Sequence, residues 1–262
     1  MTRPTPRAHL TLALAALAPL AAPAAAQVAP PASASPAALA VVPPVASCAS
    51  LAGLDLTAIG GEGSAVTTAE ETTSAGVPVC SVTATLAPQV NLQVLLPMES
   101  WTQRYLQVGC GGLCGRISLQ SGASAASLAL NDGGFVMAAT DMGHSGGMDD
   151  SGDWGLDDQQ RADFAFRAQH VTAEAAKALI RAFYGQPQRF AYFNGCSDGG
   201  REALMEAMRF PDDFDGVLAG APAMLFQVQN TLYHGWMARA NADGQGAMCS
   251  CLTNSRPCTR RC

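Results

Sequence analysis

Hydrophobic and polar positions along the chain predict strands that alternate with helices over its second half. Short apolar runs, typical of buried strands, lie at 79–86, 89–96, 104–108, 135–139, 190–193 and 217–219. Apolar residues recur at helical spacing through 160–184, and a second helical segment covers 200–209 and ends before a proline. Strand–helix–strand alternation predicts an α/β fold with a parallel sheet, and the earlier runs predict an antiparallel edge.

The first 26 residues have the pattern of a signal peptide. Arg3 and Arg7 precede an apolar run from 10 to 20, and a small-residue cleavage site precedes Gln27. Two prolines interrupt the apolar region, which falls short of the ~20 residues that a membrane span needs. We therefore expect a secreted or periplasmic protein with no membrane attachment after cleavage.

Composition divides the remaining sequence into a linker, a core and a tail. Residues 27–47 are rich in Ala and Pro, which predicts a linker, and 48–246 carry the pattern of the folded core. The segment 247–262 holds four of the nine cysteines but no continuing apolar period. We expect an unstructured or aberrant tail there, because its local pattern does not agree with the fold. A metal clip is disfavoured, because the cysteine spacing fits no known zinc site. A disulfide knot is the alternative.

Charge and composition exclude two classes of protein. The formal net charge is −6, with 48% hydrophobic and 14% charged residues. So apolar a chain is not a disordered acidic protein, and an acidic balance without a basic stripe excludes a general nucleic-acid binder. Nine cysteines in an exported chain predict disulfides, and the odd number leaves at least one thiol without a partner in this chain.

The segment 190–201 carries the candidate chemistry. Residues 195–199 fit G-x-S-x-G between a predicted strand and a predicted helix, which is the context of a nucleophile elbow. A side chain at Gly195 or Gly199 would collide with the neighbouring strand or helix. The turn places Ser197 Oγ at the carboxyl edge of the sheet, above a helix N-terminus that favours a nearby oxyanion. We predict Ser197 as the catalytic nucleophile of an α/β-hydrolase; a plain strand–helix turn is the alternative.

A glycine-rich loop at 108–115 follows an earlier strand, where the α/β-hydrolase plan needs its second oxyanion donor. We expect the backbone N–H groups of Gly111 and Gly112 to act there together with that of Asp198. A tight loop closed by Cys110 and Cys114 is a compatible alternative. A phosphate-binding loop is disfavoured, because no Lys-Ser/Thr follows.

Several segments together resemble the tannase and feruloyl esterase family. Gly-Cys-Ser-Asp-Gly-Gly-Arg at 195–201 is the most diagnostic, and similar motifs lie at 139–144, 163–167, 210–216, 219–223 and 232–236. The resemblance runs from about Cys48 to about Gly246. It implies a secreted serine esterase that cleaves feruloyl, galloyl or similar aromatic carboxylic esters through an acyl-enzyme. The implied partner is a small aromatic ester.

The resemblance also implies parts that this sequence does not show. In the family, the Cys before the Ser is bonded to a Cys directly after the catalytic His, and a lid domain with structural Ca²⁺ precedes the triad Asp and His. No His-Cys pair occurs here, so Cys196 is expected to lack its partner. We expect an incomplete α/β-hydrolase fold without lid and C-terminal strands, no cofactor or metal in this chain, and little or no esterase turnover. Cys48 with Cys80, and Cys110 with Cys114, are expected to pair locally.

The histidines offer no clear base. His234 is the one that follows Ser197 as the chain order requires, and we expect it in a loop near the start of the lid. His170 is expected to be structural. Asp141 and His144 follow a strand at the active-site edge and are candidates to shape the substrate pocket, although turn chemistry explains Asp-x-Gly equally well.

Two other functions compete with the esterase. A serine peptidase of the α/β-hydrolase type also fits G-x-S-x-G-G, but Cys196 argues against it. A non-catalytic fragment, pseudo-enzyme or binding remnant is the rival from a different class.

Overall fold

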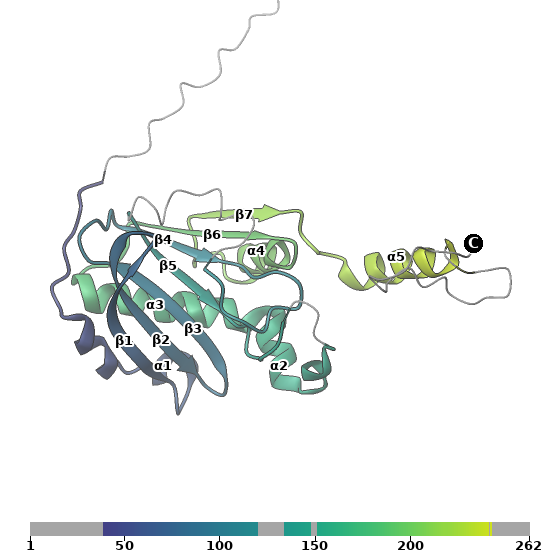
Figure 1. Ribbon diagram of the computed structural model, residues 1–262, viewed down its shortest axis with the longest axis horizontal. Helices are drawn as coiled ribbons and strands as arrows, with labels where there is room; N and C mark the ends of the chain where they lie inside the picture. The colour runs from purple at the N-terminus through teal and green to yellow at the C-terminus, as the bar shows by residue number, and fades with distance from the viewer. Residues whose placement is uncertain (1–38, 120–133, 148–150, 241, 243–262) are drawn as a thin grey trace, which may run out of the picture. The chain divides into compact units, whose positions relative to one another are not determined.

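The computed structural model describes residues 39–119, 134–147, 151–240 and 242. A seven-stranded sheet with helices packed against it forms the fold (Figure 1). The strands are β1 (Ala65–Ser74), β2 (Val77–Leu86), β3 (Val90–Pro97), β4 (Arg104–Val108), β5 (Phe135–Thr140), β6 (Phe190–Cys196) and β7 (Gly216–Gly220). The α-helices are α1 (Thr57–Gly60), α2 (Asp158–Ala162), α3 (Ala168–Tyr184), α4 (Asp198–Arg209) and α5 (Phe226–Ala240). Shorter helical turns are η1 (Cys48–Gly53), η3 (Asp153–Leu156) and η4 (Asp163–Arg167).

The strand order is β1-β2-β3-β5-β4-β6-β7. Strands β1, β2, β3 and β5 pair antiparallel, whereas β5, β4, β6 and β7 pair parallel. This confirms the predicted parallel sheet with an antiparallel edge. The sequence did not predict strand β1. Its Thr- and Glu-rich residues are mostly exposed and show no apolar alternation.

Helices α3 and α4 bury their apolar faces against the sheet in the main core. The helical period of 160–184 produces α3, whose Val171, Leu179 and Phe183 are buried. Its last residue, Tyr184, stacks on Trp101 with ring centroids 3.8 Å apart. These contacts fix α3 behind the central strands (Figure 1) and leave the strand ends to form the candidate site.

A second, smaller apolar cluster lies on other strand positions and includes Leu106, Val108 and Met137. A hollow of about 420 Å³ adjoins it on β4 to β7. Its lining is Leu106, Phe135, Tyr192, Phe193, Asn194, Gly216, Val217 and Leu218. These side chains offer neither a carboxylate nor an imidazole, so the hollow is not a candidate catalytic centre.

The described part begins upstream of Cys48. Val42 N donates to Trp101 O at 2.9 Å and Val45 N donates to Phe183 O at 2.8 Å. The end of the expected 27–47 linker therefore packs on the core. The expected signal peptide, the rest of that linker and the expected tail at 247–262 lie outside the described residues.

Helix α5 corrects one expectation. His234 lies on this helix and not in a loop, because 226–240 contains no proline and many good helix formers. None of the residues of α5 is buried. In the described part of the chain, no helix combines the length and the apolar character that crossing a membrane requires.

Candidate active site

Ser197 occupies the sharp turn between β6 and α4. Its backbone has φ 62° and ψ −117°, a strained conformation for a residue with a side chain. Two hydrogen bonds hold the turn: Ser197 N donates to Gly220 O at 3.0 Å, and Ala223 N donates to Ser197 O at 3.0 Å. Ser197 is exposed, while Asp198 after it is buried. The geometry is that of a nucleophile elbow, with the serine presented at the carboxyl end of β6.

The glycines of the motif allow α4 to approach the sheet closely. A Cβ on Gly195 would lie 2.8 Å from Gly199 Cα, and nearer still to the Gly199 carbonyl. A Cβ on Gly199 would lie 2.7 Å from Cys110 O and 3.0 Å from Gly109 C. Both obstacles are backbone atoms, which cannot rotate away as a side chain can. The motif therefore needs glycine at both positions, for the steric reason that the sequence predicts.

The glycine-rich loop after β4 lies directly against the first turn of α4. Gly199 N donates to Cys110 O at 2.8 Å, and Gly109 N donates to Asn194 O at 3.0 Å. Gly112 adopts a φ of 63° that glycine accepts without strain. The fold thus brings the loop that contains Gly111 and Gly112 to the helix start that carries Ser197 and Asp198.

Both local disulfides that the sequence predicts are present. Cys48 is bonded to Cys80, and Cys110 to Cys114, each with Cα atoms 5.5 Å apart. The first joins the N-terminal segment to β2, and the second closes the glycine-rich loop. Cys196 is a half-buried free thiol within the described part of the chain.

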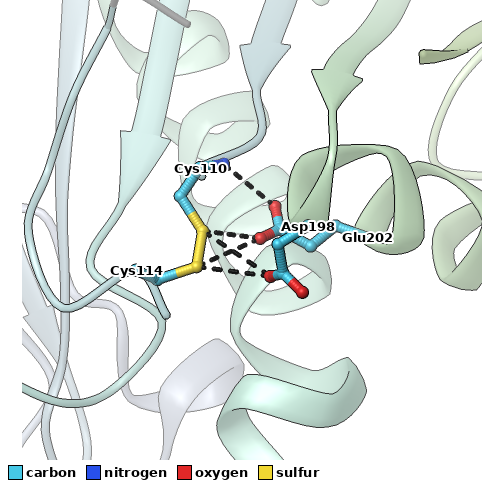
Figure 2. Close-up of side chains that lie close together, drawn as sticks. All are labelled: Cys110, Cys114, Asp198 and Glu202. Atoms are coloured by element: carbon cyan, nitrogen blue, oxygen red, sulfur yellow. Dashed lines mark hydrogen bonds between the residues drawn. A yellow bond between two sulfur atoms is a disulfide. The ribbon is translucent and has the colours of Figure 1, made fainter. Parts of the chain in front are cut away.

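Two acidic side chains of α4 face the loop disulfide (Figure 2). Asp198 and Glu202 are four residues apart, so they project from one face of the helix. Cys110 Sγ lies 2.7 Å from Glu202 Oε1, and Cys114 Sγ lies 3.4 Å from Asp198 Oδ2. Cys110 N also donates to Glu202 Oε2 at 3.3 Å. Helix α4 therefore holds the loop by side chains as well as by backbone.

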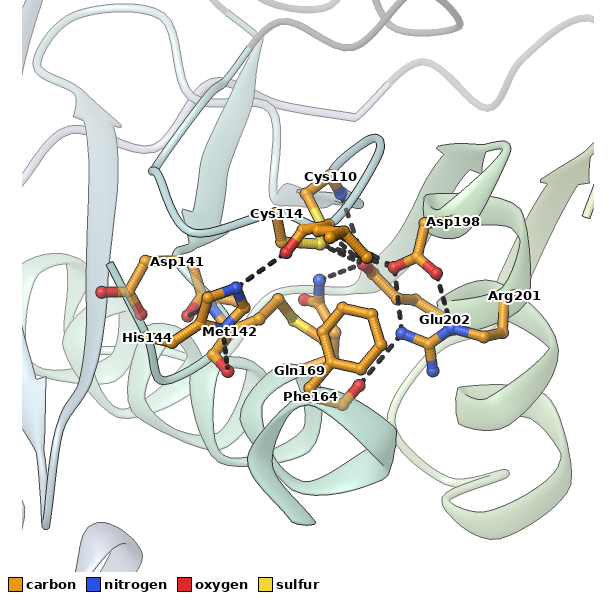
Figure 3. The surroundings of a disulfide bond; sticks show 12 residues. Cys110, Cys114, Asp141, Met142, His144, Phe164, Gln169, Asp198, Arg201 and Glu202 are labelled. Atoms are coloured by element: carbon orange, nitrogen blue, oxygen red, sulfur yellow. Dashed lines mark hydrogen bonds and ion pairs between the residues drawn. A yellow bond between two sulfur atoms is a disulfide. The ribbon is translucent and has the colours of Figure 1, made fainter. Parts of the chain in front are cut away.

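Burial has the largest effect on the pKa of Glu202 at this contact. It raises the pKa of Glu202 well above its usual value, and the neighbouring Asp198 charge adds to the effect. Arg201 neutralises Asp198 by donating from Nε to Oδ1 at 2.7 Å and from Nη2 to Oδ2 at 2.9 Å. Its guanidinium also lies over the Phe164 ring, 4.4 Å from the centroid (Figure 3). Arg201 and Asp198 thus form an ion pair at the start of α4, directly beside Glu202.

The sequence did not predict three residues of this contact: Arg201, Glu202 and Gln169. The signal was present in Asp198, Arg201 and Glu202, which repeat at i, i+3 and i+4 and so share a helix face. Gln169 donates to Glu202 Oε2 from α3, a contact that no local pattern contains.

Asp141 and His144 are buried beneath the loop. The Asp141 carboxylate accepts hydrogen bonds from Asn91 Nδ2 at 2.7 Å, from Asn91 N at 3.0 Å and from Gly143 N at 2.9 Å. Burial raises the pKa of Asp141, against the effect of these hydrogen bonds. His144 Nε2 donates to Leu113 O at 2.7 Å, because a carbonyl can only accept. The structure thus places both residues close to the candidate site with their polar atoms bonded inside the protein.

The other histidines lie elsewhere. His170 Nδ1 is 2.6 Å from Asp213 Oδ2, and its ring stacks on Phe210 with centroids 3.9 Å apart. Asp213 precedes β7, at the amino end of the parallel strands, whereas Ser197 follows the carboxyl end of β6. The pair is therefore about one strand length, ~20 Å, from Ser197. Among the described residues, Ser197 Oγ has no side-chain hydrogen-bond partner.

The family model described as tannase and feruloyl esterase matches residues 74–254. A curated relative named probable feruloyl esterase B-2, from Aspergillus flavus, is 39% identical over 137 residues, which cover 52% of this chain and 25% of the relative. The mono(2-hydroxyethyl) terephthalate hydrolase of Piscinibacter sakaiensis is 35% identical over 145 residues, covering 51% of this chain and 23% of that protein. The chain thus spans about a quarter of the length of these relatives.

Solved structures show the same likeness. Feruloyl esterase B from Aspergillus oryzae superposes with a TM-score of 0.61 and 26% identity, covering 76% of this chain and 42% of that one. The tannin acyl hydrolase from Aspergillus niger gives a TM-score of 0.50 and 27% identity, covering 68% and 35%. With its mixed sheet, the chain has an α/β-hydrolase fold that corresponds to part of these esterases, as the sequence predicts.

Proposed function

This chain belongs to the tannase and feruloyl esterase family, and we propose that it contains the catalytic serine and the oxyanion hole of a serine esterase. The proposed substrates are aromatic carboxylic esters. The observation that supports this most directly is the strained, exposed Ser197 at the turn between β6 and α4. The names of the relatives support ester hydrolysis with feruloyl, galloyl and terephthalate-like acyl groups as the candidate class.

The proposed reaction begins with attack of Ser197 Oγ on the ester carbonyl carbon. A histidine base accepts the hydroxyl proton, and the carbonyl oxygen becomes an oxyanion. The backbone N–H of Asp198 and those of Gly111 and Gly112 stabilise that oxyanion. Collapse releases the alcohol, which takes the proton from the histidine, and leaves an acyl-enzyme. Water then attacks the acyl-enzyme by the reverse proton transfers and releases the aromatic acid.

The placement of the loop supports this assignment of the oxyanion donors. Gly199 N donates to Cys110 O and Cys110 N donates to Glu202 Oε2, so the residue directly before Gly111 is bonded to the first turns of α4. The N-terminus of α4 adds a partial positive charge at the same place. Among the described residues no histidine is hydrogen-bonded to Ser197, so the proposal names no base within the described part of the chain. The family pattern further implies that Cys196 bonds to a cysteine beside the histidine base.

Export is part of the proposal. The signal-peptide pattern at 1–26 and the two disulfides both fit an oxidising compartment. The proposed partner is the small ester, and the acidic net charge of −6 gives no support to nucleic-acid binding.

The test joins residues 27–246 to the C-terminal part of a family esterase and assays feruloyl and galloyl esters beside a peptide panel. We expect ester cleavage that falls by about 10³-fold or more in Ser197→Ala, the loss typical of a missing nucleophile. Ser50→Ala is the matched control, since Ser50 is an exposed serine that bonds locally to Ser47 O. Cleavage that survives in Ser197→Ala removes Ser197 from its role, and cleavage of peptides alone favours the peptidase.

A further inference from the structure

Two sulfur atoms and two carboxyl groups converge beneath the glycine-rich loop (Figure 2). The ligand atoms of Cys110, Cys114, Asp198 and Glu202 lie within 4.8 Å of one another, and all four residues are buried. Carboxylate oxygens and sulfurs are electron-pair donors, so a buried space that they line together suits a cation.

We propose that reduction of the Cys110–Cys114 disulfide turns this cluster into a binding site for a divalent transition metal ion such as Zn²⁺. The ligands are the two thiolates and one carboxylate oxygen each from Asp198 and Glu202. Thiolate ligands select zinc-like ions over Ca²⁺ and Mg²⁺, which prefer oxygen. The proposal rests on the geometry of these four side chains and does not require the proposed esterase reaction.

The sulfur–oxygen distances lie on either side of the value for a tetrahedral site. They are 2.7, 3.4, 3.4 and 4.0 Å. Their average of about 3.4 Å is close to the edge of about 3.5 Å that follows from tetrahedral bonds of ~2.3 Å to sulfur and ~2.0 Å to oxygen. The same geometry needs the two sulfurs about 3.8 Å apart, a separation that opening the disulfide allows. The residues between the two cysteines include Gly111 and Gly112, so the loop can accommodate the change.

The surroundings already orient both carboxyl groups. Cys110 N and Gln169 Nε2 donate to Glu202 Oε2, which leaves Oε1 facing the sulfurs. Arg201 holds both oxygens of Asp198. Such partners behind the ligands are typical of metal sites, because they fix ligand orientation before the ion arrives.

The charges of the four proposed ligands are nearly balanced once a divalent ion is bound. Two thiolates and two carboxylates carry four negative charges, a divalent ion offsets two, and Arg201 offsets one more. The remaining negative charge lies at the N-terminus of α4, where the helix dipole favours it. Asp198 and Arg201 are the charged groups that contribute to the electrostatics of Glu202, and Gln169 from α3 is neutral.

The redox step needs a dithiol reductant. A thiolate of the reductant attacks one sulfur of the disulfide, and the reductant closes to its own disulfide as Cys110 and Cys114 become thiols. The metal ion then displaces the thiol protons and the Glu202 proton to solvent. An exported chain passes through this reduced state before its disulfides form.

The experiment titrates the chain with Co²⁺, whose tetrahedral thiolate complexes are coloured, in oxidised and dithiol-reduced forms. Cys249, Cys251, Cys258 and Cys262 are replaced by Ser throughout to remove competing thiols. We expect one Co²⁺ per reduced chain with sulfur-to-metal charge-transfer absorption, and none in the oxidised form. Absence of that absorption in the reduced chain overturns the proposal.

Matched variants locate the site. Cys114→Ser and Glu202→Gln should weaken Co²⁺ binding by more than about tenfold. Cys80→Ser, which removes a thiol of the other disulfide, and Glu206→Gln, which alters another buried Glu of α4, should leave it unchanged. Equal binding in Cys114→Ser contradicts the assignment.

If a variant does not fold, the site can still be tested in the chain with an unmutated loop, by measuring whether Zn²⁺ protects its cysteines from alkylation. One equivalent of Zn²⁺ should block alkylation of Cys110 and Cys114 in the reduced chain while Cys196 still reacts. Uniform alkylation of all three cysteines would also overturn the site.

Discussion

Replacing Gly195 by Ala tests whether the close approach of α4 to the sheet is what the elbow motif requires. The new Cβ would lie 2.8 Å from Gly199 Cα and closer to the Gly199 carbonyl. Separations of that size do not occur between real atoms, so β6 or α4 must move. The obstacle is backbone on both sides, and no rotamer change relieves it.

The expected cost follows from that geometry. Overpacked cores lose about 1–3 kcal/mol, and we expect about 3 kcal/mol here because the contacts cannot relax through a side chain. For a domain of this size, that loss lowers Tm by about 6–12 °C. Gly155→Ala is the control, because a Cβ on Gly155 meets nothing within 4 Å. Its free energy of unfolding should stay within about 0.5 kcal/mol of the parent chain.

Urea unfolding followed by circular dichroism measures both variants under identical conditions. Gly200→Ala gives an independent check, since its Cβ would lie 2.8 Å from Pro222 Cα on the far side of the helix start. If Gly195→Ala unfolds at the same urea concentration as Gly155→Ala, helix–sheet proximity is not the reason for the glycine and the steric account fails.

Two further predictions concern stability away from the elbow. Burial, reinforced by the Asp213 charge, raises the pKa of Glu206 to about 9, so the folded chain holds a proton that the unfolded chain has released above about pH 5. The free energy of unfolding should therefore fall between about pH 5 and pH 9, by up to about 1.4 kcal/mol per pH unit from this group, and Glu206→Gln should flatten that slope; equal slopes in urea titrations would contradict it. The Cys48–Cys80 disulfide spans a sequence separation of 32, so the Cys48→Ala/Cys80→Ala double variant should lose about 3–4 kcal/mol, and non-reducing peptide mapping should find the pair linked in the parent chain.

Local patterns predicted most of the parallel sheet, because the physical causes of its strands are local, and both disulfides were predicted as well. The apolar runs give the central strands, and the helical period gives α3. Strand β1 has no such signal, since its stability comes from pairing with β2 and not from burial of its own side chains. Helix α5 was missed for a related reason: its sequence favours a helix, but none of its residues is buried, so no apolar face marks it.

The candidate site divides in the same way. G-x-S-x-G predicted the strand–turn–helix around Ser197, because the glycine spacing is itself the steric requirement. Glu202 contacts Cys110, which is 92 positions away in the sequence, and Gln169, which is 33 positions away. Sequence spacing within one helix or strand cannot predict contacts over such separations. The pairing of His144 with Leu113 is similarly a tertiary contact. Sequence reasoning placed Asp141 and His144 near the site, but it could not show that the fold already uses their polar atoms.

Helix α4 links the proposed nucleophile, Ser197, to the loop that contains the proposed oxyanion donors. Its first residue follows Ser197, its Gly199 N holds the Cys110 carbonyl, and one turn later Glu202 holds the Cys110 N–H. The turn at Ser197 and the loop are therefore joined through one helix by two hydrogen bonds. A change at the loop disulfide, by reduction or metal binding, must either keep these two hydrogen bonds or move the loop amides relative to Ser197. Since oxyanion stabilisation depends on donors held about 2.7–3.1 Å from the developing charge, even a shift of about 1 Å in the loop should be felt at the serine.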